Sequence, residues 1–345
     1  MTPMMYSLLI STISTGTIIT MTSHHWLLAW LGLELNTIAM IPILAKPHHP
    51  RATEAATKYF LIQAAAAATI LFATTLNAWQ TGQWTITQPT SPLAMMVLTI
   101  AIAMKLGLAP THLWYPEIMQ GATMPTALII STWQKLAPLT LLLMTSNCLS
   151  TNILLTLGLL SALIGGWLGL NQTQTRKIMA SSSIAHMGWV AIALTLSPNL
   201  TTLTLTIYII MTTTMFLTLI STTTKTLTDF NTAWSYSPTM MSTTTMTLMS
   251  LGGLPPLTGF MPKWLIIKNL THLQLLPLAI MLVLSTLPSL FFYTRMAYLA
   301  MLTTPPSTTT TKHKWRTKTK MPPATPMLTI ITTTLLPITT LIKYY

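Results

Sequence analysis

Apolar segments of about 20 residues follow one another along most of this 345-residue chain, and they restrict its possible folds more than any other feature. Each segment is long enough to cross a bilayer as an α-helix, whereas the strands of a membrane β-barrel alternate over about 10 residues. Only 6% of the residues are charged, against about a quarter in an average soluble domain. The sequence therefore predicts an all-α, polytopic membrane protein.

Hydropathy predicts about eleven membrane spans that are separated by short polar turns. The expected spans are 3–22, 25–45, 53–78, 92–121, 125–145, 150–170, 177–196, 200–224, 238–270, 274–300 and 324–342. Residues 225–237 and 303–323 are expected to form loops. We expect the spans to form a single membrane domain over residues 1–345.

Two of these spans, 92–121 and 238–270, carry glycine and proline near their middle and are predicted to be broken helices. The interruption lies at Gly107–Pro110 in the first, and we place its counterpart at Gly252–Pro255 in the second. Backbone groups freed by such a break are tolerated in a membrane only where protein or water satisfies them. Two discontinuous helices of one design indicate an ion transporter that is built from repeats.

Four ionisable residues lie deep inside the predicted spans, and they are Glu34, Lys105, Lys135 and Lys263. A charge near the bilayer centre costs at least about 2.5–3.5 kcal/mol, so these residues predict a function. Glu34 and Lys105 lie at similar depths on spans that enter from the same side, which makes an ion pair between them geometrically possible. The four residues predict a proton relay, to which His112 and His186 are possible additions because imidazole carries protons readily.

The net charge of +13 is better explained by loop cations that set the orientation of the chain in the membrane than by nucleic-acid binding. Ten cations fall in loops after even-numbered spans. They are Lys46, Arg51, Arg176, Lys177, Lys225 and the five cations of residues 312–320. By the positive-inside rule, these loops and the N-terminus face the cytoplasm-equivalent side. The single cysteine, Cys148, allows no internal disulfide and no thiolate metal cluster, and we expect no metal site.

Four long motifs resemble one known family. They are KLGLAPTHLWYPEIMQG (105–121), STWQKLAP (131–138), GGWLGLNQTQTRKIMASSSIAHMGW (165–189) and LGGLPPLTGFMPKW (251–264). Together they are similar to the chain 2 family of mitochondrial NADH–ubiquinone oxidoreductase, which are antiporter-like membrane subunits of respiratory complex I. The resemblance covers most of the chain.

The resemblance implies a core subunit of the membrane arm, in contact with neighbouring antiporter-like subunits and with membrane lipids. Its implied function is proton translocation across the inner mitochondrial membrane, coupled to electron transfer from NADH to ubiquinone elsewhere in the complex. The family's buried glutamate falls on Glu34, and its lysines fall on Lys105, Lys135 and Lys263. The complex uses NADH, FMN, iron–sulfur clusters and ubiquinone, but this chain is expected to bind no cofactor and to carry no redox chemistry. The N-terminus and the basic loops would face the matrix.

Two other functions share these sequence features. A stand-alone cation/proton antiporter would also use broken helices and buried lysines, although Glu34 is the only deep carboxylate and metal cations prefer several oxygen ligands. A structural membrane scaffold would use the same charges only to pair helices. Ion exchange by the isolated chain in liposomes would indicate the antiporter, and unchanged pumping after loss of Lys105 would indicate the scaffold.

Overall fold

The computed structural model describes residues 2–86, 91–235, 237–301 and 322–336. Within these ranges the chain forms α-helices and two short 3₁₀-helices, and no strand. Contacts between residues group the chain into two compact units, Met1–Ser161 and Ala162–Tyr345. The expected single domain stays a prediction.

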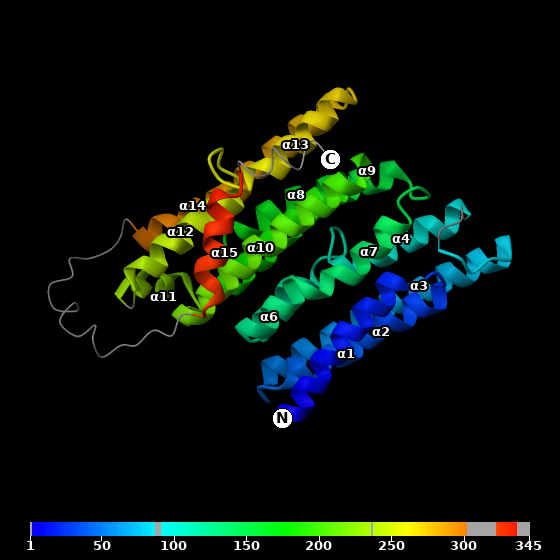
Figure 1. The fold of residues 1–345 in the computed structure, drawn as a ribbon, viewed down its shortest axis with the longest axis horizontal. Coiled ribbons are helices and arrows are strands. Elements are labelled where there is room, and N and C mark those ends of the chain that lie inside the picture. Colours follow the sequence, from blue (N-terminus) through cyan, green and yellow to red (C-terminus); the bar gives the residue numbers. More distant parts are fainter. Residues whose placement is uncertain (1, 87–90, 236, 302–321, 337–345) are drawn as a thin grey trace. The chain divides into compact units, whose positions relative to one another are not determined.

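The first unit consists of helices of which the first four pack in chain order. The helices of this unit are α1 (Pro3–Thr22), α2 (Trp26–Ala45), α3 (Pro50–Thr81), α4 (Pro92–Leu106), α5 (Trp114–Gly121), α6 (Met124–Ser131), η1 (Trp133–Lys135), α7 (Leu136–Met144) and the first part of α8 (Thr151–Gly169). Each of α1, α2 and α3 lies beside the next helix, and α4 lies against α3 (Figure 1). Prolines begin α1, α3 and α4, where the missing N–H has no helical partner to lose.

Helices α1 and α2 approach closely because glycines face each other. A Cβ on Gly32 would lie 2.8 Å from the carbonyl oxygen of Gly16 and 2.7 Å from Cγ2 of Thr20. Small residues allow membrane helices to approach in this way.

We expect Gly32→Ala to destabilise the chain by about 1–3 kcal/mol, the usual cost of overpacking, and to lower the unfolding temperature of the purified complex. Leu31→Met, at an exposed neighbour, is the control, and an equal loss in both variants would contradict this interpretation.

The second unit contains the end of α8 and the helices that follow it. They are α9 (Thr175–Leu196), α10 (Pro198–Thr222), α11 (Leu227–Thr232), η2 (Ala233–Ser235), α12 (Pro238–Gly252), α13 (Phe260–His272), α14 (Leu276–Met301) and α15 (Ala324–Thr334). Helix α10 contacts α9, α12 and α15, and α14 runs beside α12 (Figure 1). Threonine hydroxyls inside these helices donate to carbonyls three residues earlier, as Thr244 does to Met241 at 2.7 Å.

The prediction of a loop over residues 225–237 is wrong in part, because the segment contains α11 and η2. Thr226 and Asp229 form a capping box at the start of α11, in which each side chain accepts from the backbone N–H of the other residue. The N–H of Thr226 is the main group that lowers the pKa of Asp229, since it stabilises the carboxylate. The T-x-x-D pattern was the missed signal.

Both predicted broken helices are present and share one backbone design. Gly107 ends α4 at φ 72° and Gly253 ends α12 at φ 81°, the left-handed conformation that glycine adopts without strain. In each case the N–H of the residue after the glycine donates a hydrogen bond to the carbonyl five residues earlier. Leu108 donates to Ala103 at 3.0 Å, and Leu254 donates to Met249 at 3.3 Å. This is a Schellman cap, which satisfies carbonyls that the break would leave unpaired.

The structure corrects the register of the repeat by one residue. The sequence motifs align Gly252 with Gly107, but the glycine that caps α12 is Gly253. With that change the helix starts, caps and following prolines all keep one offset of 146 residues (92 to 238, 107 to 253, 110 to 256 and 114 to 260). The paired glycines at 252–253 made both alignments possible in the sequence.

Eight helices among the described residues are long and apolar enough to cross a membrane. They include α6 to α7 taken together, as Met124–Met144, whereas the halves of the broken helices and α15 are shorter. The all-α membrane fold with two broken helices is confirmed, and the number of about eleven spans stays a prediction. Most of the expected loop 303–323, with its five cations, and the end of the expected last span lie outside the described residues.

Candidate functional site

Lys105 lies in the last turn of α4, two residues before the glycine that caps the break. The carboxyl end of a helix carries partial negative charge, so this position favours a cation. The side chain is buried, and its Nζ has no hydrogen-bond partner among the described residues. Burying a charged group without a partner is costly, so this position favours a water molecule bound to the Nζ.

Lys135 lies at a helix irregularity that the hydropathy pattern does not predict. The expected continuous span 125–145 is interrupted by η1 at Trp133–Lys135. Pro138 has no N–H to donate to the carbonyl of Gln134, and the chain tightens into a 3₁₀ turn at this point. Lys135 is buried in this turn, with its Nζ 5.0 Å from the ring centre of Tyr115.

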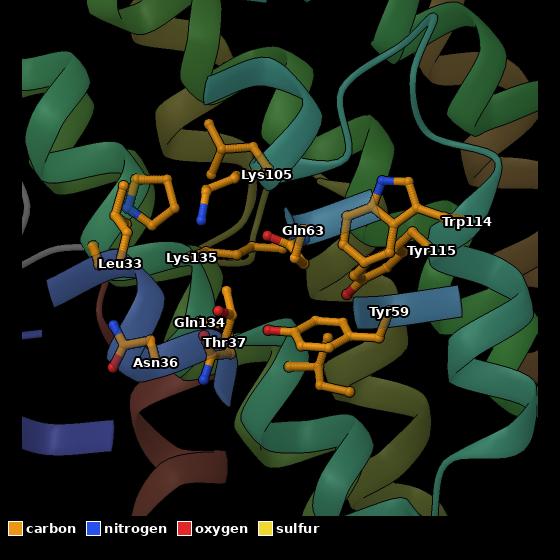
Figure 2. Close-up of a pocket in the computed structure, with 14 residues that line it drawn as sticks. Leu33, Asn36, Thr37, Tyr59, Gln63, Lys105, Trp114, Tyr115, Gln134 and Lys135 are labelled. Carbon is orange, nitrogen blue, oxygen red and sulfur yellow. The ribbon is translucent and has the colours of Figure 1, made fainter. Parts of the chain in front are cut away.

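A cavity of about 20 Å³ connects the two lysines in the first unit, and it has room for about one water molecule. It is lined by Leu33, Asn36, Thr37, Tyr59, Gln63, Lys105, Leu106, Trp114, Tyr115, Ile130, Gln134, Lys135, Ala137 and Pro138. Figure 2 shows the amine of Lys105 and the hydroxyl of Tyr59 directed toward the space between these side chains. The structure thus brings Lys105 and Lys135 together, as the relay hypothesis requires.

Glu34 does not form the ion pair with Lys105 that the sequence made possible. In the part of the chain that the structure describes, ion pairs join Lys58 to Glu54 at 2.6 Å and to Glu117 at 2.7 Å, and none joins Glu34 to Lys105. The Oε2 of Glu34 instead lies 2.7 Å from the hydroxyl of Thr37, which lines the cavity. Any effect of the Glu34 carboxylate on Lys105 would therefore act through space, since no ion pair joins the two among the described residues.

Several neutral polar residues of this site were missed in the sequence. Thr37 joins Glu34 to the cavity, and Asn36, Gln63 and Gln134 line it. The amide atoms of Asn36 and the Nε2 of Gln134 are buried with no hydrogen-bond partner among the described residues. Amide side chains inside an apolar span were the available signal, because burying one without a partner is costly.

Lys263 lies in the second unit, on the first turn of α13. It is buried, and its Nζ donates a hydrogen bond of 2.9 Å to the carbonyl of Gly252, the last residue of α12. A cavity of about 20 Å³ is lined by Lys263 and His186, together with residues of α9 and α10. The Nε2 of His186 lies 3.4 Å from the hydroxyl of Tyr293. The structure therefore brings His186 to Lys263.

His112 lies at the first break and is buried, but it lines neither of these two cavities. Neither of its ring nitrogens has a hydrogen-bond partner among the described residues. The structure does not bring His112 to the cavity of Lys105 and Lys135, and its part in a relay stays a prediction.

Comparison with known proteins identifies the family. A family model described as NADH:quinone oxidoreductase/Mrp antiporter matches residues 23–288, and one described as NADH dehydrogenase subunit 2 C-terminus matches residues 290–343. NADH-ubiquinone oxidoreductase chain 2 of Gallus gallus is 51% identical over 327 residues, which cover 95% of this chain and 94% of the relative. The chain belongs to the NADH–ubiquinone oxidoreductase chain 2 family. The member from Carassius auratus is 52% identical over 342 residues, 98% of each chain.

Solved structures agree with this family and confirm the antiporter-like fold. A chain in respiratory complex I from Thermus thermophilus with bound aureothin has a TM-score of 0.86 and 25% identity, over 98% of this chain and 79% of that one. A chain in the archaeal membrane-bound sulfane sulfur reductase has a TM-score of 0.84 over 98% of this chain and 73% of that one. At 16% identity, the second likeness shows the fold alone.

Proposed function

We propose that this chain is a core membrane-arm subunit of respiratory complex I, the NADH:ubiquinone oxidoreductase, and takes part in its proton translocation. Chain 2 relatives match over nearly the full length, and the related solved chain comes from complex I. The chain contributes to the enzyme as a multi-pass subunit of a larger membrane complex. Electron transfer from NADH to ubiquinone, with FMN and iron–sulfur clusters, takes place elsewhere, and this chain binds no cofactor.

The arrangement of Lys105 and Lys135 around one small polar cavity is the observation that carries the proposal. A water held in the cavity would lie beside both lysines, which line it, and could accept a proton from one ammonium and pass it to the other amine. The Glu34 carboxylate stabilises the charge on Lys105, and its Thr37 hydrogen bond links it to the cavity. A change in that carboxylate's position or charge would then release the proton of Lys105.

The second unit offers a further proton site at Lys263. Its ammonium is stabilised by the carbonyl end of α12, and His186 lines the same cavity. The hydroxyl of Tyr293 lies next to the imidazole of His186, which gives that ring a polar partner. We include Lys263 in the proton relay on these contacts, with His186 as an additional member.

The proposed location is the inner mitochondrial membrane, with the N-terminus and the basic loops on the matrix side. Five cations support this orientation, because each lies near a helix end on one side of the expected topology: Lys46, Arg51, Arg176, Lys177 and Lys225. Neighbouring antiporter-like subunits and lipids are the proposed partners, and no nucleic acid is expected. The basic charge serves orientation within this membrane.

Glu34→Gln tests the proposal in the assembled complex. We expect NADH oxidation coupled to proton pumping to fall about five- to tenfold, a rise of about 1–1.4 kcal/mol in the barrier, because the amide no longer stabilises the Lys105 ammonium. The protons moved per electron and the rate of NADH oxidation are to be measured together in proteoliposomes.

Glu54→Gln is the matched control. Glu54 is exposed and pairs with Lys58, and an exposed pair of this kind contributes about 0–1 kcal/mol. This variant should retain near-wild-type pumping. Equal activity in both variants would overturn the role of Glu34 and leave the scaffold function as the better account.

A further inference from the structure

A lipid-sized groove lies between α12 and α14 of the second unit, away from the buried lysines. It encloses about 720 Å³, a volume typical of sites that hold extended small molecules. Met246 and Met249 of α12 form one wall, and Phe291 and Tyr298 of α14 contribute to the other. Met246, Phe291 and Tyr298 are all more than half exposed, at 53%, 56% and 56%. The groove therefore presents an apolar surface at the side of the helices.

Among the described residues, Arg295 is the one charged residue that lines this groove. Its Nη1 donates a hydrogen bond of 3.1 Å to the carbonyl of Leu170, directly after the end of α8. That bond fixes the position of the guanidinium and uses one of its five N–H donors. A planar guanidinium held in this way suits a phosphate group, which it can bind through two parallel hydrogen bonds.

The position of Arg295 near the end of α14 indicates the headgroup level of a bilayer. Its partner Leu170 lies between the last residue of α8 and the polar turn NQTQ at 171–174. On α14, Arg295 lies six residues before Met301, which is about 9 Å along the axis. Tyr298 lies one turn further toward that end, as interfacial aromatic residues do. The charge thus lies near the membrane boundary, while Met249 extends the groove along α12 toward the break at Gly253.

We propose that this groove binds a phospholipid, whose phosphate is held by Arg295 and whose acyl chain lies against Met246, Met249 and Phe291. The cation is matched by the anionic phosphate at the level where phosphates lie, and the exposed apolar wall is matched by the acyl chain. An apolar helix of another subunit would cover the wall but would bring no anion to the guanidinium.

Arg295→Gln and Met246→Trp test the two parts of this site separately. The first removes the phosphate partner, and the second fills the groove while leaving the charge in place. We expect each to reduce labelling of residues 245–301 by a phospholipid with a photoreactive group in its acyl chain at least threefold. The label is to be added to the purified complex, and the modified peptides are to be identified by mass spectrometry.

Arg51→Gln serves as the control because it removes one exposed cation that lines no part of the groove. Its labelling should equal that of the wild-type complex. The proposal is overturned if Arg295→Gln labels as strongly as this control. It is also overturned if chemical cross-linking joins the groove residues to another subunit in the wild-type complex and no lipid adduct is found there. Normal pumping in both groove variants would leave the proposed function untouched, so the two proposals fail independently.

Discussion

Lys105→Ala is expected to leave the complex assembled and to lower coupled NADH oxidation and proton pumping at least about tenfold. A tenfold loss corresponds to about 1.4 kcal/mol in the barrier. The methyl group cannot bind a proton, and it removes the one cation in the last turn of α4. Assembly should persist because Lys105 forms no hydrogen bond or ion pair in the described residues that its loss would break. Proton-to-electron ratios and native gels of the same membranes measure both effects.

Lys105→Arg separates proton loading from charge pairing. A guanidinium keeps its charge but hardly ever releases a proton, so this variant should pump nearly as poorly as Lys105→Ala if the lysine must be loaded and unloaded. If charge alone is needed, Lys105→Arg should pump nearly normally, and the relay would be refuted. Lys46→Gln is the control, because Lys46 is exposed directly after the end of α2, with its Nζ 4.5 Å from the ring centre of Tyr6.

Gly259→Ala is expected to have the largest effect on stability, with a loss of more than about 3 kcal/mol. Gly259 precedes α13, and a Cβ there would overlap the backbone carbonyl of Ser250 in α12. Backbone atoms cannot move aside as a flexible side chain can, so the two halves of the broken helix would have to separate. The amount of the subunit in assembled complex should fall at least about tenfold, as measured by native gel and mass spectrometry.

Gly252→Ala is the matched control at the same break. Its Cβ would meet only ordinary contacts, the nearest being Cδ2 of Tyr293 at 3.8 Å, and its backbone is helical. Assembly should therefore remain close to that of the wild type. If both variants assemble equally badly, the break tolerates no added methyl group at either position. The contact between Gly259 and Ser250 is then not the specific cause of the loss of assembly.

Much of the architecture could be predicted from apolar run lengths and from the positions of glycine and proline. The broken helices and the burial of Lys105, Lys135 and Lys263 were predicted correctly because the cost of charge and of freed backbone in a membrane leaves few alternatives. The turn at η1 could not be predicted from Pro138 alone, because a proline inside a helix can cause a kink, a 3₁₀ turn or the end of the helix.

The failed ion pair shows what residue spacing leaves undetermined. Counting residues along a helix gives the depth of Glu34 and Lys105, because the rise per residue is constant. It does not give the rotation of each helix about its own axis, which decides whether two side chains at equal depth face each other. Thr37, three residues after Glu34, accordingly takes the carboxylate contact instead. Side-chain networks of this kind depend on packing and could be found only in the structure.

The constant offset between the two breaks has a mechanical consequence. At equivalent backbone positions, Lys105 corresponds to Leu251 and Lys263 corresponds to Glu117, so the buried lysine precedes one break and follows the other. Both ammonium groups nevertheless lie at the carbonyl end of a half-helix, Lys105 within α4 and Lys263 through its bond to Gly252. Bending at the breaks would carry Lys263 away from that carbonyl end while Lys105 stayed on its own half-helix. The same kind of break would thus move the lysine charge relative to the carbonyl end of the half-helix in the second repeat and leave it in place in the first.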